Sequence, residues 1–356
     1  MMHRLSWHVG KTVFAAIAVT LMVLVGLDSV GAIIDQSADV TRNYFFADAL
    51  IYVVTLVPSR IYEYIPFASL IGCLVGLGLL AGNSEVIVMR AAGVSPVRIV
   101  GFVLKPVLIF IILGMTIGEY FSPYLDQLAE GKREYLRKGE SAQDSSSGLW
   151  NREGNQFMHA NAVFPGGVLY GVTRYQFNDE RQIQEASFAS RATFNSTERY
   201  WIEENVSVTR FLGDSTERDK LITRRWDSEL TPNVLMLNIL PADSLSIESL
   251  YSYIAFLELQ NIDTASYEVA LWRKALQPLI IIGLVLLGIS FVFGPLRDST
   301  MGFRIFIGVV FGISFRIFQD MLGPLSVVFQ FPPLLAVLVP ILFCVLVGVF
   351  LLRRSG

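Results

Sequence analysis

The apolar residues of this chain gather into long runs instead of being spread evenly along it. Runs of about 20 or more residues cover positions 12–34, 61–82, 99–120, 269–293, 301–322 and 333–352. An α-helix rises about 1.5 Å per residue, so about 20 apolar residues match a hydrocarbon core roughly 30 Å thick. The pattern therefore predicts six membrane-spanning helices, three on each side of a long polar stretch.

The first run follows Arg4 and Lys11 but is too long for the core of a signal peptide, and no small-residue cleavage site follows it. We therefore expect it to stay in the membrane as an anchor. Residues 35–60 mix polar and apolar positions and include Pro58, so we expect a connecting segment there, before the second span.

The polar stretch between the third and fourth spans has the pattern of a β domain. Short runs of strand-like composition alternate with turn signals such as Pro165-Gly166-Gly167 and Asn178-Asp179. Short strands at regular spacing with turns between them are typical of a sandwich or jelly roll. The candidate strands are 156–163, 168–177, 182–193, 200–211 and 234–240.

A short amphipathic helix is expected where the polar stretch returns to the membrane, because Ile247, Leu250 and Ile254 recur at helical spacing and Ser246 suits an N-cap. The chain is thus interpreted as an α-helical membrane protein with an inserted all-β, jelly-roll-like domain. Transmembrane helices occupy 1–122, the β domain and its connecting helix 123–265, and the remaining transmembrane helices 266–356.

Composition supports a membrane protein and excludes several other classes. Charged residues make up 17% of the chain, against about 25% in soluble domains, and mean hydropathy is +0.51. The net charge of −3 comes with no basic tract that suggests nucleic acid. Cys73 and Cys344 both lie in apolar runs, so a disulfide framework in the polar domain is excluded. The three histidines are scattered without metal-ligand spacing, and we predict no metal and no cofactor.

Signatures of catalysis are missing. Gly10-Lys11-Thr12 resembles the end of a phosphate-binding loop, but position 5 is leucine where that loop needs glycine, and no strand precedes it. No paired-histidine helix, serine elbow or Cys-x-x-Cys motif is present. We therefore nominate no catalytic residue, and if ATP drives this protein, a separate chain hydrolyses it.

Lysine and arginine in the short flanks of the spans predict the orientation. With the N-terminus in the cytoplasm, the short outer segments hold Arg42 and Arg60, and the 323–332 loop holds neither residue type. Six spans then return the C-terminus to the cytoplasm and place the β domain outside. The basic residues of the cytoplasmic flanks are Arg4, Lys11, Arg90, Arg98, Arg297, Arg304, Arg353 and Arg354.

The first cytoplasmic loop, residues 82–98, predicts a short helix. Asn83 or Ser84 suits the N-cap, and Glu85 then lies in the first turn, where a carboxylate suits the helix dipole. Gly93 and Pro96 end it. The helix is either a docking surface or merely interfacial, and the pattern leaves both open. Its surface residues are Val86, Ile87, Met89 and Arg90.

Charged residues inside the spans are costly, roughly 2.5–3.5 kcal/mol at a helix centre. Asp28 lies in the outer third of the first span, while Arg316 and Asp320 stand four residues apart in the fifth. The pair either neutralises itself or faces a polar cavity or charged ligand. Lys274 is placed to snorkel to the membrane surface.

Two further patterns each leave a choice open. Lys132 and Arg133 follow the third span among acidic residues, so they form either a solvated helix surface or a phosphate-binding cluster. Small residues four apart permit close helix contact or reflect how common glycine is in membrane helices. These pairs are Gly72/Gly76, Gly114/Gly118 and Gly308/Gly312.

Taken together, the order of spans and several motifs resemble one known family over essentially the whole chain. The motifs are "GKTVF" at 10–14, "NSEVIVMRAAGVSP" at 83–96, "QPLIIIGLVLLGISFVFGPLR" at 277–297, "GPL" at 323–325 and "PP" at 332–333. The chain resembles the YjgP/YjgQ permease family, and one of its two paralogues more than the other.

The resemblance implies an exporter subunit of the bacterial inner membrane. Such a permease pairs with a paralogous permease as a heterodimer and with a cytoplasmic ATPase dimer. The assembly extracts lipopolysaccharide from the inner membrane and passes it to a periplasmic bridge protein. No catalytic residue, cofactor or nucleic acid is implied for the permease chain.

The resemblance also implies roles for particular residues. The 83–95 segment is the family's coupling helix, so Glu85 contacts the ATPase, together with Met89 and Arg90. Asp28, Arg316 and Lys274 lie near the lipid cavity. Lys132 and Arg133 match basic positions that meet lipid phosphates. The family's lysines at the outer end of the first helix are absent here, where Arg42 is the nearest cation.

Three other readings compete. A receptor needs a cytoplasmic output domain, which the short inner loops do not provide. A secondary transporter predicts inverted repeats and midplane charges, and the two halves show no such symmetry. An exporter of another lipid or of lipoproteins is the alternative nearest to the reading above, and the lipid that co-purifies distinguishes it.

Overall fold

A computed structural model of the chain describes residues 2–40, 43–138, 149–164, 166–213, 215–228, 230–232, 235, 241–259, 263–293 and 299–355. The chain forms two compact units. The helical unit comprises Met1–Val30, Val57–Phe121 and Ser246–Gly356. The sheet unit comprises Gly31–Leu56 and Ser122–Leu245.

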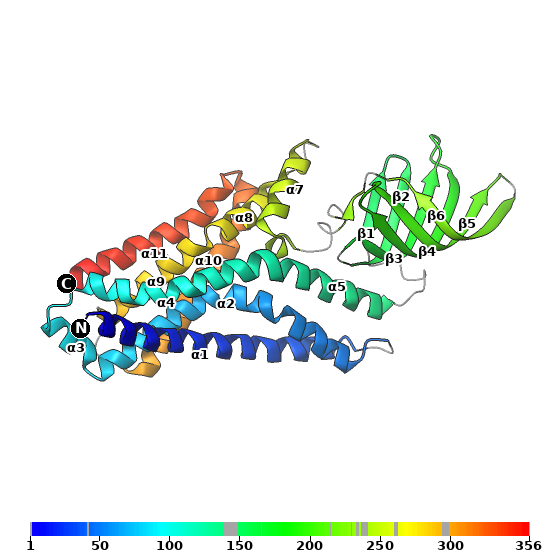
Figure 1. Ribbon diagram of the computed structural model, residues 1–356. Coiled ribbons are helices and arrows are strands. Elements are labelled where there is room, and N and C mark those ends of the chain that lie inside the picture. Colours follow the sequence, from blue (N-terminus) through cyan, green and yellow to red (C-terminus); the bar gives the residue numbers. More distant parts are fainter. Residues whose placement is uncertain are drawn as a thin grey trace. The chain divides into compact units, whose positions relative to one another are not determined.

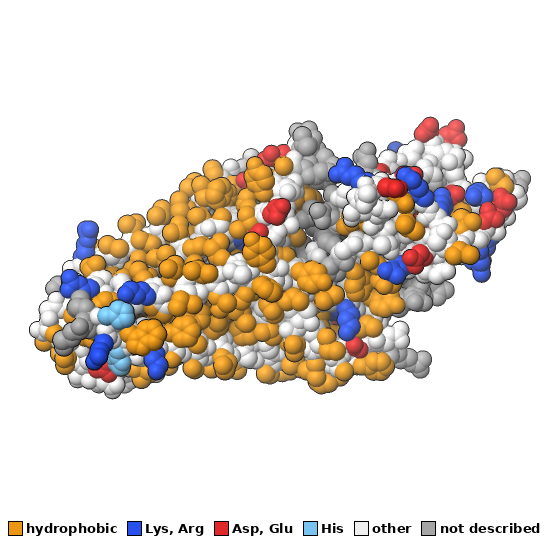
Figure 2. All heavy atoms as spheres, in the orientation of Figure 1, with side chains coloured by type: hydrophobic (Ala, Val, Ile, Leu, Met, Phe, Trp, Pro, Cys, Tyr) orange, Lys and Arg blue, Asp and Glu red, His pale blue; other side chains and the backbone are white. Residues whose placement is uncertain are grey.

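Long apolar helices confirm the predicted membrane protein (Figure 1). Within the described residues, five helices are long and apolar enough to cross a membrane, or six if one bent pair counts as a span. Large hydrophobic side chains cover much of the helical unit's visible face (Figure 2), as lipid contact requires. The five helices are α1 (Met2–Ser37), α2 (Phe46–Gly82), α4 (Pro96–Thr116, continued by η1 and α5), α10 (Met301–Phe329) and α11 (Pro333–Ser355).

The expected connection over 35–60 is mostly helical. α1 runs on to Ser37, and α2 begins at Phe46 and contains Pro58. The carboxylate of Asp48 accepts a hydrogen bond from the backbone N–H of Phe45 at 3.1 Å, the bond that an N3 side chain makes to the residue before the helix in a capping box. Pro58 was expected to lie before the second helix, but it lies inside α2, because a long membrane helix tolerates proline.

The fourth span, expected as one helix over 269–293, is bent by 58°. α8 (Ala265–Ala275) and α9 (Gln277–Phe293) meet at Leu276. Pro278 cannot donate to the carbonyl of Lys274, and its ring crowds that carbonyl, which weakens a helix at this point. Prolines inside α2, α4, α10 and α11 do not break those helices.

The third span continues beyond its predicted end. A π-helical turn, η1 (Ile117–Phe121), joins α4 to α5 (Ser122–Lys138). α3 (Glu85–Ala91) lies between α2 and α4, and α7 (Ile247–Leu259) precedes α8. The predicted N-cap of α7 is confirmed, because the hydroxyl of Ser246 accepts from the N–H of Ser249 at 3.1 Å.

The glycine pairs mark close helix contacts. A Cβ built on Gly72 would lie 2.5 Å from the Cα of Ile17, and one on Gly118 would lie 2.3 Å from the Tyr62 ring. One on Gly308 would lie 2.7 Å from a methyl of Leu74. The small residues therefore allow neighbouring helices to pack closely, as membrane helices need in the absence of a hydrophobic driving force.

Within the described residues, the inserted domain forms one antiparallel sheet whose six strands pair in sequence order. This meander differs from the crossed order of a jelly roll. Four strands match the predicted ones, and 234–240 lies outside the described residues except for Leu235. The strands are β1 (Leu149–Glu153), β2 (Gln156–Phe164), β3 (Val168–Phe177), β4 (Ile183–Asn195), β5 (Tyr200–Phe211) and β6 (Thr216–Trp226).

β1 and β6 were not predicted. β6 reads TERDKLITRRW, and its charges hide the apolar alternation on which strand prediction depends. It pairs only with β5 within the described sheet, and charged side chains are common on such edge strands. The sheet's core contains Trp201, stacked on Trp226 with ring centroids 5.7 Å apart.

Candidate functional site

The predicted loop helix is confirmed as α3, and its end is built as expected. The N–H of Gly93 donates to the carbonyl of Arg90, and the N–H of Val94 donates to that of Met89, both at 3.0 Å. This is a Schellman motif, in which Gly93 takes a φ of +83°. Met89 and Val94 are both buried in the core of the helical unit. The motif gives α3 a rigid C-terminal end.

The start of α3 differs from the prediction. Ser84 occupies the N-cap position, but its φ of 61° is left-handed and its side chain makes no capping hydrogen bond. A side-chain cap needs an extended N-cap residue. Glu85 instead bonds to α1, where the Nε2 of His8 lies 2.8 Å from its carboxylate.

The surface that α3 presents also differs. Val86 and Met89 are buried against the helical unit, so they are not a docking surface. Ile87 and Val88 are 55% and 65% exposed. Arg90 is partly exposed in the last turn. The exposed part of α3 is therefore Ile87, Val88 and the edge carrying Glu85 and Arg90.

Six charged side chains form a continuous chain across four helices of the helical unit. Asp28 of α1 lies 3.2 Å from Arg60 of α2, which lies 3.3 Å from Glu63. Glu63 binds Arg316 of α10. We call the set Asp28, Arg60, Glu63, Arg316, Asp320 and Arg273 the charge chain.

The charge chain revises the interpretation of Arg316. Asp320, its predicted partner, lies 3.6 Å away and also contacts Arg273 of α8 at 3.5 Å. Glu63 on another helix makes the closer contact. Three guanidiniums alternate with three carboxylates along the set, so the numbers of basic and acidic side chains match. The sequence did not reveal this, since α2 lies far from α10 along the chain.

Lys274 does not snorkel. Its side chain is 5% exposed and donates to the carbonyl of Gly118 in the π-helical turn, at 3.1 Å. Nearby, Gln277 donates to the carbonyl of Tyr62 at 3.2 Å. Pro66 has no N–H for that carbonyl, so Gln277 replaces the missing helical bond. Side chains at the α8–α9 break thus satisfy main-chain groups at irregular turns of other helices.

Arg133 lies in the sheet unit and is bound by carboxylates. It donates to Asp39 at 2.8 Å and to Glu130 at 3.0 Å, and it covers the ring of Tyr52. The hydrogen bond from Arg133 holds the pKa of Asp39 below its ordinary value, although partial burial opposes the shift. Lys132 is half-buried on α5, and Arg42 lies outside the described residues.

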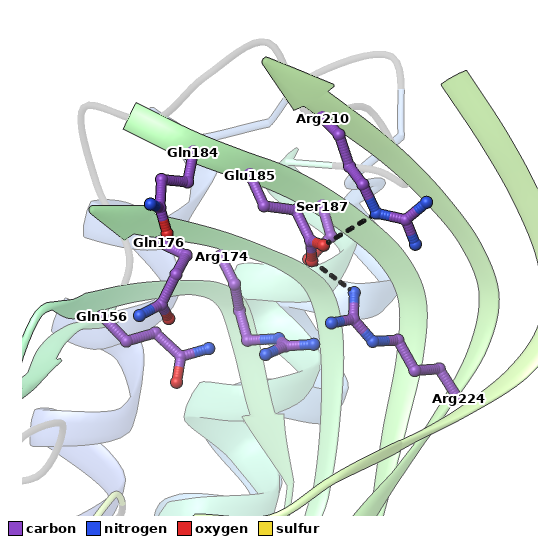
Figure 3. A pocket seen from close by; sticks show the side chains of 8 residues that line it. All are labelled: Gln156, Arg174, Gln176, Gln184, Glu185, Ser187, Arg210 and Arg224. Atoms are coloured by element: carbon purple, nitrogen blue, oxygen red, sulfur yellow. Dashed lines mark hydrogen bonds and ion pairs between the residues drawn. The ribbon is translucent and has the colours of Figure 1, made fainter. Parts of the chain in front are cut away.

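The sheet carries a polar cavity of about 400 Å³ on one face (Figure 3). Glu185 of β4 binds Arg224 at 2.6 Å and Arg210 at 3.5 Å. Arg174, also in the wall, is buried and bound through two nitrogens to Glu203, each bond 2.7 Å long. Simple strand alternation does not bring these side chains to one face, because the buried positions of β5 shift register at Asn205, where φ is +52°. Arg224 could not be placed from the sequence either, since β6 was not predicted.

Comparison with known proteins identifies the family. The family profile described as "Lipopolysaccharide export system permease LptF/LptG" matches residues 7–354. The chain is 32% identical over 354 residues to the lipopolysaccharide export system permease protein LptG of Escherichia coli K12, covering 99% of this chain and 98% of the relative. LptG of Haemophilus influenzae is 32% identical over 356 residues, covering 100% and 99%.

Both relatives carry the name of the paralogue that the resemblance favoured, LptG over LptF. The matches run through both membrane segments and the inserted sheet, so the likeness concerns the whole architecture. This multi-pass membrane protein belongs to the lipopolysaccharide export system permease LptF/LptG family.

Proposed function

We propose that this chain is an LptG-type permease subunit of an ATP-driven exporter that extracts lipopolysaccharide from the inner membrane. It pairs with a paralogous permease, takes its energy from a cytoplasmic ATPase dimer, and passes the lipid to a periplasmic bridge protein. The observation that carries the proposal is the family match over residues 7–354. Co-purification tests it: a bound ATPase and lipopolysaccharide support it, whereas a different lipid or lipoprotein favours the alternative exporter.

The proposed orientation keeps both termini in the cytoplasm and the sheet unit in the periplasm. The flanking arginines support it, although Arg304 no longer counts as a loop charge because it is buried and donates to the carbonyl of Gly78. The two native cysteines are buried, so single cysteines at Ser196 and Ser299 label without background. Labelling of Ser299→Cys by an impermeant external reagent would overturn the orientation.

We assign α3 as the coupling helix, with Glu85 as its contact to the ATPase. A rigid helix transmits a push, and the Schellman motif makes the C-terminal end of α3 rigid. The exposed Ile87 and Val88 supply an apolar contact, and Arg90 a charged one. Met89 acts from within, by anchoring α3 to the helical unit. His8 orients the Glu85 carboxylate.

Glu85→Ala should reduce the amount of ATPase that co-purifies, and unchanged ATPase stoichiometry would argue against the assignment.

We infer that the charge chain lines the lipid path and that Arg316 exchanges Glu63 for a lipid phosphate. The two anions bind a guanidinium in the same geometry, so the exchange keeps Arg316 paired throughout. Asp28 and Arg60 hold α1 beside α2 during the exchange. Lys274 acts only indirectly, since its position in the bundle keeps it from the lipid.

Photo-crosslinking from α10 tests this role of Arg316. Arg316→Gln should reduce crosslinking to lipopolysaccharide about tenfold, because it removes one charge-assisted contact of roughly 1.5–3 kcal/mol. Asp320→Asn, which leaves the Glu63 contact intact, is the matched control. Equal crosslinking in the wild type and Arg316→Gln would leave a self-neutralised ion chain as the better account.

The same exchange is proposed for Arg133, with Lys132 beside it. The carboxylates of Asp39 and Glu130 form ion pairs with the Arg133 guanidinium, in the places that phosphate oxygens would take. Asp39→Asn should therefore increase lipid crosslinking near α5, and Arg133→Gln should decrease it. A decrease in both variants would show that the cluster is structural. Arg42 remains a proposed contact on sequence grounds alone.

A further inference from the structure

A groove runs between the N-terminal part of α1 and α4, outside α3 and the charge chain. Its volume is about 510 Å³, and its wall includes Ser6, Trp7, Lys11, Phe14 and Lys105. Gly10 forms part of the wall, where a Cβ would lie 3.9 Å from Pro106. The two helices therefore approach closely beneath an open hollow.

The groove is graded from cationic to apolar. At one end, Lys105 donates to the hydroxyl of Ser6 at 3.0 Å, and His3 and Lys11 also line the wall. Farther along both helices, Phe14 packs on Phe110 with ring centroids 5.1 Å apart. Figure 2 shows lysine, arginine and histidine side chains gathered at the end of the helical unit that carries the N-terminus and α3, beside an apolar surface.

The lining has the chemistry of a phospholipid site. It includes two lysines and a histidine but no carboxylate, so the positive charge is not neutralised within the wall. Trp7 is 71% exposed, and exposed tryptophans of membrane helices lie at the headgroup level. The apolar wall below it suits acyl chains. A free phosphate ion would leave this apolar part unfilled.

We propose that the groove binds an anionic phospholipid, with its phosphate at Lys11 and Lys105 and the upper part of an acyl chain against Phe14. The lipid comes from the leaflet at the N-terminal end, which is the cytoplasmic leaflet in the proposed orientation. Trp7 and Lys11 of the groove flank His8 on α1, and His8 bonds to Glu85 of α3. A lipid in the groove would therefore bind the same part of α1 that contacts α3. The site itself depends only on the chain lying in a membrane.

Fluorescence quenching in nanodiscs tests the site on the full chain. Quenching by phosphatidylglycerol brominated at upper acyl positions is compared with quenching by equally brominated phosphatidylcholine. The fluorescence of Trp7 is obtained by subtracting the fluorescence of a Trp7→Phe variant from that of the wild type. Phosphatidylglycerol should associate with Trp7 more tightly, by about fivefold for each lysine. Lys11→Gln should lose about fivefold of this preference, whereas Lys11→Arg should keep it.

The controls separate the groove from a general surface charge. Arg98→Gln, on the same face of the membrane but outside the groove, should keep the preference. Lys105→Gln should also lose about fivefold of the preference. Because this variant also removes the hydrogen bond to Ser6, Lys11→Gln provides the test if Lys105→Gln fails to fold. Inorganic phosphate should displace no lipid beyond a sodium chloride control of equal ionic strength.

Three results would overturn the proposal: equal quenching by the two lipids, an equal loss in Arg98→Gln, or displacement by inorganic phosphate. The measurement uses neither ATP nor lipopolysaccharide. Its failure would therefore leave the exporter function standing, and failed export would leave the lipid site standing.

Discussion

The two units of this protein satisfy buried cations in different ways. In the helical unit, Arg304 and Lys274 are 4% and 5% exposed and donate to main-chain carbonyls of other helices. In the sheet unit, Arg174 is 7% exposed and binds the Glu203 carboxylate through two hydrogen bonds. These two deeply buried cations of the helical unit bind backbone dipoles, whereas Arg174 binds an opposite charge.

The difference follows from the two kinds of secondary structure. Regular helices and strands use their own carbonyls, but irregular turns free some of them. The helical unit has such places at the π-helical segment and at Pro66, where Lys274 and Gln277 donate to main-chain carbonyls. Arg304 differs, because the Gly78 carbonyl that it meets lies in an α-helical part of α2. The strands of the sheet leave few carbonyls free, so a buried guanidinium needs a carboxylate. Breaking a bond to a main-chain carbonyl and removing a paired carboxylate should therefore lower stability by different amounts.

The largest expected effect is at the buried ion pair of the sheet. Glu203→Ala leaves the Arg174 guanidinium unpaired in the interior, which should lower the free energy of unfolding by about 3–5 kcal/mol. Urea unfolding followed by tryptophan fluorescence measures it. In a Trp7→Phe/Trp272→Phe background, the remaining tryptophans all lie in the sheet unit.

The double variant Arg174→Met/Glu203→Leu is the matched control. Replacing both charges by apolar groups of similar volume is often close to neutral. If the double variant unfolds as easily as Glu203→Ala, packing rather than charge pairing explains the loss.

A smaller effect is expected where α2 meets the π-helical turn. Gly118→Ala puts a methyl 2.3 Å from the Tyr62 ring position, and such overpacking costs roughly 1–3 kcal/mol. Thermal unfolding of the full chain in detergent should show a lower Tm. Gly101→Ala on the same helix has open space around it and should leave Tm unchanged or slightly raised. Equal Tm values for the two variants would contradict close packing here.

A double-mutant cycle tests whether Gln277 replaces the helical hydrogen bond that Pro66 cannot donate to the Tyr62 carbonyl. Gln277→Leu removes the donor to the Tyr62 carbonyl and should cost about 1–2 kcal/mol. Pro66→Ala restores an N–H to that carbonyl, so Gln277→Leu should cost almost nothing in that background. Additive effects of the two substitutions would mean that Gln277 does not replace the missing helical bond.

The smallest effect concerns acid stability near Arg133. Because the folded pKa of Asp39 is lowered, its pairing stabilises the sheet unit above the ordinary value of 3.8 and is lost as pH falls below it. Asp39→Asn should remove this part of the acid sensitivity, so its Tm should fall less than that of the wild type below about pH 4. Parallel Tm–pH curves would assign the sensitivity to other carboxylates.

These comparisons show which features the sequence could predict. The spans, the position of α3, its Gly93 stop and four strands follow from periodicity and turn residues, which are local signals. β6 was missed because its charges mask the alternation. The bend at Pro278 did not follow from the sequence, because proline removes a hydrogen bond but stands inside α2, α4, α10 and α11 without breaking them.

The site was only partly predictable for a related reason. Arg316 and Asp28 stood out because a charge in a span is costly. Their partners were not singled out: Arg60 fell at the end of the expected 35–60 connection and Glu63 at the start of the expected second span. The contacts also join helices far apart in sequence. Met89 is an apolar residue on a loop helix and so was expected on a docking surface, but the fold shows that it is buried. Burial of this kind depends on tertiary packing.

ATP-dependent release of lipopolysaccharide tests the central claim most directly. Proteoliposomes would hold the assembled complex and lipopolysaccharide, with crosslinking of the lipid to the periplasmic bridge protein as the readout. The wild type should transfer lipid only with ATP, and Glu85→Ala should transfer it at least tenfold more slowly, since truncating one partner of an interfacial charge pair costs roughly 2–5 kcal/mol. Asn83→Ala, next to α3, should transfer at the wild-type rate. Transfer without ATP, or an unchanged rate in Glu85→Ala, would contradict the account.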